Sequence, residues 1–74
     1  MEKYKGAVVV ATSRTRSTEI ARLPDGSHIS VFHGSRRDIV EAIPPAALED
    51  YCRGLTVRPN PPYPLGEVRE FAQG

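Results

Sequence analysis

The sequence predicts an α+β fold in a single domain over residues 1–74: a three-stranded antiparallel meander, one broken helix packed on a face of that sheet, and a proline-rich extended C-terminal strap. Three observations predict these parts. Residues 1–33 contain β-branched runs separated by polar turns, residues 35–54 show helical spacing broken by prolines, and residues 57–66 contain four prolines. A chain of this length has room for one small core.

The meander is predicted from three short runs joined by turns. "KYKGAVVVATSR" is rich in β-branched residues and predicts a strand that ends near Thr12, "STEIARL" predicts a second strand, and "HISVFH" predicts a third. Between the last two runs, Pro24–Ser27 is a strong turn signal, because proline presets φ and glycine accepts a positive φ. Short connections between consecutive strands favour antiparallel pairing.

The broken helix is predicted over residues 35–54. Ser35 is a suitable N-cap, and a narrow stripe of apolar residues follows it. Pro44 and Pro45 interrupt the helix after about two turns, because proline lacks the backbone donor that a helix interior needs. "PAALEDYCRG" then restarts the helix, with Pro45 in its first turn and Gly54 as the C-cap.

The proline-rich segment, residues 57–66, is expected to be extended, because its four prolines favour polyproline II geometry. Its simplest role is a stiff strap with Tyr63 and Leu65 packed on the sheet. The same segment has the spacing R-x-x-P-x-x-P of a polyproline ligand for an aromatic groove. The residues with that spacing are Arg58, Pro61 and Pro64. Residues 67–74 form a short terminal segment whose period does not separate a strand from a helical turn.

Charge is distributed unevenly along the chain although the net charge is only +1. The first 37 residues carry seven Lys and Arg against three acids, and the rest carry three Arg against six acids. Such a chain can orient on a charged partner. The longest apolar run, Ala7–Ala11, is too short to span a membrane, and the N-terminus shows no export signal, so a cytoplasmic location is expected. The lone cysteine, Cys52, is expected to be a buried apolar residue.

Strand alternation separates the residues of "HISVFH" into two faces. Ile29, Val31 and His33 are expected to face the core. The other three side chains are expected to form an exposed sheet face that binds a protein partner: His28, Ser30 and Phe32. The two histidines point to opposite faces, and no other histidine exists, so no metal site and no cofactor are predicted.

The stretch "HGSRR" predicts an anion-binding turn. At a helix N-terminus the first N–H groups point outward at the positive end of the helix dipole, and adjacent arginines add formal charge. Arg14 and Arg16, on the turn between the first two predicted strands, would lie on the same side if the meander curls toward this turn. The predicted anion or nucleic-acid contacts are Arg14, Arg16, Gly34, Ser35, Arg36 and Arg37. The alternative is a plain capping turn with solvated arginines.

Gly26, Ser27 and His28, followed by an apolar strand, resemble the Gly-Ser-His strand of the HicA family of small RNA-cleaving toxins, which have a double-stranded-RNA-binding-like fold. The resemblance covers about a tenth of the chain and implies a general acid/base role for His28. It departs from the family in two respects. The family's aromatic residue follows at a slightly shorter spacing than Phe32 does here, and this chain opens with a strand where the family has a helix.

Taken together, these patterns predict a small non-catalytic binding protein. The first hypothesis is an accessory or inhibitory factor that engages a larger protein through the exposed sheet face and the basic turns. The second is a nucleic-acid-binding module that uses the basic N-terminal half on backbone phosphates. The third is a HicA-like ribonuclease with His28 as its only candidate catalytic residue.

Overall fold

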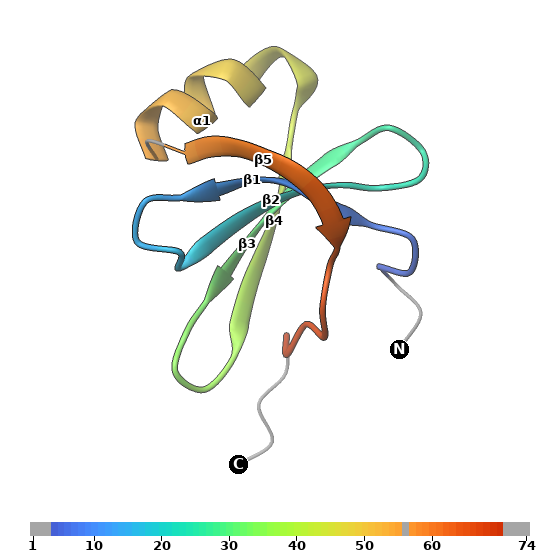
Figure 1. Cartoon of the computed structure of the whole chain (residues 1–74), viewed down its shortest axis with the longest axis vertical. Helices are drawn as coiled ribbons and strands as arrows, with labels where there is room; N and C mark the ends of the chain where they lie inside the picture. Colours follow the sequence, from blue (N-terminus) through green and yellow to red (C-terminus); the bar gives the residue numbers. More distant parts are fainter. Residues whose placement is uncertain (1–3, 56, 71–74) are drawn as a thin grey trace.

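The computed structural model describes residues 4–55 and 57–70. Within these residues, five strands form one antiparallel sheet in the order β4-β3-β2-β1-β5, and a short helix, α1, precedes β5 (Figure 1). The α+β class and the antiparallel pairing are therefore confirmed, whereas the predicted count of three strands is too low. None of the helical segments in this part of the chain has the length and apolar character to cross a bilayer.

The first three strands occupy the three predicted runs: β1 (Val8–Ser13), β2 (Thr18–Arg22) and β3 (His28–His33). The predicted turn between β2 and β3 also forms, with Gly26 at a φ of 91°. Its Asp25 carboxylate accepts hydrogen bonds from the backbone N–H of Ser27 (2.9 Å) and from its hydroxyl (2.6 Å). Local turn chemistry is therefore sufficient to place this hairpin.

Strand β4 (Asp38–Ile43) stands where the first half of the broken helix was predicted, so that half of the prediction is wrong. Pro44 limits a helix here to about two turns, which is too short to be stable alone. As a strand, the segment instead pairs with β3 along its whole length, from His28 opposite Ile43 to His33 opposite Asp38. Ser35 consequently lies in the β3–β4 turn and is not a helix N-cap.

The second half of the predicted helix is confirmed as a short 3-10 segment, Pro45–Ala47, followed by α1 (Leu48–Leu55). Gly54 lies inside α1, so its expected role as C-cap is wrong. The apolar side of α1 packs on one face of the sheet through Leu48, Tyr51 and Cys52, against Ala11, Ile20 and Ile43.

Strand β5 (Val57–Pro64) is the segment predicted as a proline-rich strap. It is extended as expected, and it pairs with β1, from Val57 opposite Ser13 to Pro64 opposite Val8, with an irregularity between Val9 and Ala11. Prolines lack the N–H donor, so a proline-rich strand is tolerated only at a sheet edge. β5 occupies such an edge (Figure 1).

The opposite face of the sheet carries a second apolar cluster, which the end of the chain covers. Leu65 and Val68 pack against it, and the backbone N–H of Leu65 donates to the carbonyl of Ala7 (3.0 Å). The buried members of this cluster are Ala7, Ala21, Ile29 and Val31. The sheet therefore has apolar side chains on both faces, with α1 on one and residues 65–69 on the other. Of the terminal segment 67–74, residues 71–74 lie outside the described part, and residues 67–70 form neither strand nor helix.

Candidate anion-binding site

Strand order brings three distant parts of the chain to one end of the sheet. β1 and β3 both end where β2 and β4 begin, so the β1–β2 turn (residues 14–17) and the β3–β4 turn (residues 34–37) share that end. The backbone N–H of His33 donates to the carbonyl of Ser17 (2.7 Å), which joins the two turns. β5 also begins there, because Val57 lies opposite the last residue of β1.

Five exposed arginines gather at this end, which we call the arginine end: Arg14, Arg16, Arg36, Arg37 and Arg58. Four of them were predicted as anion contacts. Arg58 was missed, because its neighbourhood depends on the pairing of β5 with β1 and the proline-rich sequence gave no sign of that pairing. Within residues 4–55 and 57–70, none of the five forms an ion pair with a carboxylate.

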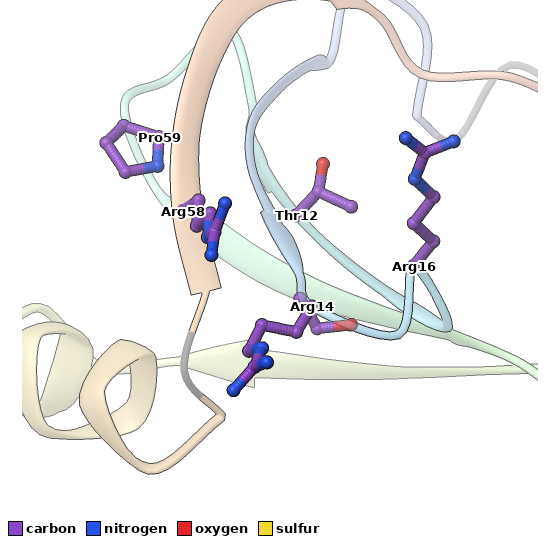
Figure 2. A pocket seen from close by; sticks show the side chains of 6 residues that line it. Thr12, Arg14, Arg16, Arg58 and Pro59 are labelled. Atoms are coloured by element: carbon purple, nitrogen blue, oxygen red, sulfur yellow. The ribbon is translucent and has the colours of Figure 1, made fainter.

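Three of these arginines line an open pocket of about 360 Å³. Figure 2 shows Thr12 between Arg58 of β5 and Arg16 of the β1–β2 turn, with Arg14 extending in a different direction from the end of β1. Ser13 and Pro59 complete the lining. An open pocket with guanidinium groups from two chain segments and a hydroxyl is suited to a phosphate or carboxylate.

Hydroxyl groups fix the turn that presents Arg14 and Arg16. The hydroxyl of Ser13 accepts the backbone N–H of Thr18 (3.1 Å), and the hydroxyls of Thr15 and Ser17 are 2.7 Å apart. Arg16 has a φ of 65°, a left-handed conformation that side chains other than glycine rarely adopt. The polar composition of "TSRTRST" therefore builds a tight turn whose tip is an arginine.

Two carboxylates at this end of the sheet, Glu19 and Asp38, already have partners. Glu19 contacts His33 Nε2 through Oε1 (2.7 Å) and accepts the hydroxyl of Tyr63 through Oε2 (2.5 Å). Asp38 is only 2% exposed and accepts the Arg69 backbone N–H (2.9 Å) and its Nη2 (3.0 Å). Because these acids have partners of their own, they do not neutralise the exposed arginines.

His33 lies between two carboxylates, with Nε2 at 2.7 Å from Glu19 and Nδ1 at 3.2 Å from Asp38. Both contacts are hydrogen bonds only when both ring nitrogens carry a proton. Burial alone lowers the pKa of His33, but the hydrogen bonds and negative charges of Glu19 and Asp38 outweigh it and raise that pKa above 6.5. The surroundings thus favour the protonated ring, and both of its nitrogens contact carboxylates.

The same network holds Asp38 in its ionised form. Burial by itself raises the pKa of Asp38, but hydrogen bonds from Arg69, and then the hydrogen bond and charge of His33, overcome that effect and hold the pKa below 3.8. The carboxylate is therefore charged over the whole neutral range and ties the C-terminal segment to β4.

Gly34 and Ser35 were predicted at a helix N-terminus, and the structure removes that basis. The N–H of Gly34 already donates to the Arg37 carbonyl (3.1 Å) inside the β3–β4 turn. A Cβ at Gly34 would approach that carbonyl oxygen to 2.6 Å, so the turn requires glycine. Arg36 and Arg37 remain exposed on the turn, but no helix dipole supports them.

The predicted protein-binding face is only partly exposed. α1 covers Ser30, which is 2% exposed and accepts a hydrogen bond from the hydroxyl of Tyr51 (2.7 Å). His28 is half-buried. Phe32 is 44% exposed and lies opposite Ile39 of β4, which is 47% exposed. A small apolar pair on β3 and β4 therefore replaces the continuous face that alternation predicted.

The described residues give little support for catalysis by His28, for a metal site or for a reactive Cys52. The His28 ring forms no hydrogen bond or ion pair with the described residues, so no acid/base partner accompanies it. Among those residues, no group of three or more His, Cys, Asp or Glu is arranged to hold a metal ion. Burial raises the pKa of the Cys52 thiol, which keeps it protonated and unreactive.

Comparison of the chain with protein-family models, with curated proteins and with solved structures found no match. Function is accordingly inferred from the arginine end itself.

Proposed function

We propose that this protein is a non-catalytic binding module that holds the backbone phosphates of a nucleic acid at its arginine end. One observation carries the proposal: five exposed arginines from three chain segments share one end of the sheet without a carboxylate partner in the described chain. Guanidinium groups bind phosphate oxygens in pairs, which makes arginine the preferred residue for this contact.

The spread of the arginines favours a polyanion over a single small anion. Arg14, Arg16 and Arg58 line the pocket, whereas Arg36 and Arg37 lie on the adjoining turn. Five guanidinium groups exceed what one phosphate can occupy, whereas successive phosphates of a strand can use them. Because the net charge is only +1, we expect weak, salt-sensitive binding with a Kd of about 1–100 μM at physiological salt.

The test measures binding of a labelled oligonucleotide by fluorescence anisotropy at several salt concentrations. Arg16→Gln and Arg58→Gln should each lower affinity and reduce the slope of log affinity against log salt by about 0.7–0.9, the value for one phosphate contact. The matched control is Arg22→Gln, which removes the same charge from an exposed position at the other end of β2.

Three results would contradict the proposal. These are no binding of nucleic acid by the wild type even at low salt, equal affinities of the pocket variants and the wild type, and an equal loss of affinity in the Arg22 control. The last result would mean that overall charge, and not the arginine end, governs binding.

A protein partner is the second candidate function, and the exposed pair Phe32 and Ile39 favours it. Capture from cells that contain the native protein should retain one discrete chain with the wild type and with Arg16→Gln. Phe32→Ala should lose that chain while its thermal unfolding stays cooperative. Equal retention by all three proteins would contradict this placement.

A further inference from the structure

Tyr63 lies close to the arginine pocket, and its side chain reaches from β5 across β1 to Glu19 of β2. It lies on β5 opposite Val9 and is 41% exposed. The hydrogen bond to Glu19 raises the pKa of the Tyr63 hydroxyl, burial adds to this, and the pocket residues Thr12 and Arg16 oppose it. The Tyr63 hydroxyl donates to Glu19 Oε2, and Glu19 lies opposite the pocket residue Thr12 in the β1–β2 ladder, so the hydroxyl end of the ring lies next to the pocket.

The ring is held at both ends. Its backbone belongs to the β1–β5 ladder, and its hydroxyl donates to Glu19 Oε2 (2.5 Å), whose other oxygen contacts His33. An aromatic side chain fixed in this way loses little conformational freedom when a ligand covers its exposed area. Beside cationic groups, such a ring is a platform on which a nucleobase can stack.

The residues next to Tyr63 prevent the β5 edge from pairing with another strand. Pro61, Pro62 and Pro64 are exposed along β5, and each lacks the N–H that an incoming strand would need. The edge therefore cannot pair with an extended peptide along these residues. It offers a ring and pyrrolidine surfaces next to arginines, which is a combination that suits an unpaired base and its phosphates.

We propose that Tyr63 stacks on an unpaired base while Arg16 and Arg58 hold the phosphates on either side of it, so that the preferred ligand is single-stranded nucleic acid. This inference rests on the proposed function. In a duplex the faces of the bases are covered by their neighbours, so Tyr63 gains no contact there, whereas the arginines can still reach phosphates.

The experiment compares a single strand with a duplex of the same sequence. Tyr63→Leu keeps an apolar side chain but removes the aromatic ring. It should weaken single-strand binding by about 5- to 150-fold, the range for loss of one stacked base, and leave duplex binding within about twofold. Tyr63→Phe keeps the ring and should retain most of the single-strand affinity. Arg58→Gln should weaken binding of both ligands.

A measurement on the wild type avoids any dependence on folding of the variants. An oligonucleotide containing 5-iodouracil, irradiated in the complex, should crosslink to the peptide that carries Tyr63. Crosslinks confined to other peptides would overturn the inference, as would equal single-strand affinities of Tyr63→Leu and wild type.

The outcomes separate the two proposals. If Arg58→Gln weakens binding but Tyr63→Leu does not, the phosphate contact stands and base stacking is wrong. If the wild type binds neither ligand at low salt, the proposed function itself fails, and the inference fails with it.

Discussion

The two faces of the sheet are covered by chain segments of different kinds. α1 covers one face with apolar contacts to residues such as Ile20. Residues 65–69 cover the other face without regular secondary structure, and the ion pair of Arg69 with Asp38 holds them in place. The first cover depends on burial of apolar area, the second on ionised side chains as well.

The two covers are therefore expected to respond differently to pH. Apolar packing under α1 is indifferent to pH, whereas the cover made by residues 65–69 needs a charged Asp38 and gains from a charged His33. Tyr63 belongs to the same network through Glu19, so the charged face is also the face that borders the arginine pocket. Four substitutions test this difference between the two faces.

The largest effect is expected from Ile20→Ala, on the face that α1 covers. Ile20 is among the largest fully buried side chains, so its truncation leaves a cavity and should lower the free energy of unfolding by about 2–5 kcal/mol. Urea denaturation measures this. The control is Ile39→Ala at an exposed position of β4; an equal loss there would contradict the assignment of the core.

Asp38→Asn should cost about 2–4 kcal/mol, because it leaves Arg69 and His33 facing a neutral amide in place of a buried carboxylate. The loss should be local as well as global. Hydrogen exchange of the Leu65 amide, which donates to Ala7, should accelerate more than exchange under α1. Uniform acceleration over both faces would show that the two covers are not separate.

Tyr51→Phe should cost about 1–2 kcal/mol, because it leaves the buried hydroxyl of Ser30 without the donor at 2.7 Å. The matched change is Tyr51→Phe in a Ser30→Ala background, where the hydroxyl is absent and the second substitution should cost less. Equal costs in both backgrounds, measured by urea denaturation, would argue against this hydrogen bond.

The smallest effect is the pH dependence that His33 confers, since its side chain is partly solvated. Its folded pKa lies above 6.5, so its stabilising contribution is fully present below pH 6.5 and is lost as pH rises through the folded pKa. Thermal stability should therefore fall as the pH rises from about 6.5 through the folded pKa, and His33→Gln should flatten that decline. A decline of equal steepness in the variant would exclude His33 as its source.

Local signals were enough for part of the fold. The β-branched runs and the Pro24–Ser27 turn placed β1, β2 and β3, and Pro45 placed the start of the helical region. Residues 38–43 fit a helical stripe and a strand equally well, and the open edge of β3 decided between them. That edge is a property of the assembled sheet, which no window of sequence contains.

Sequence also predicted only part of the candidate site. Arg14, Arg16, Arg36 and Arg37 were found from local charge and turns, and strand order alone brings them together. Arg58 and Tyr63 were missed as site residues because their position depends on pairing between the first and last strands. Ser30 was wrongly expected on an exposed face, because alternation within a strand does not reveal that α1 covers it.

The hydrogen bond from His33 to the Ser17 carbonyl has a mechanical consequence for recognition. It ties the backbones of the two basic turns together, so a ligand that engaged both turns would not have to bring them together first.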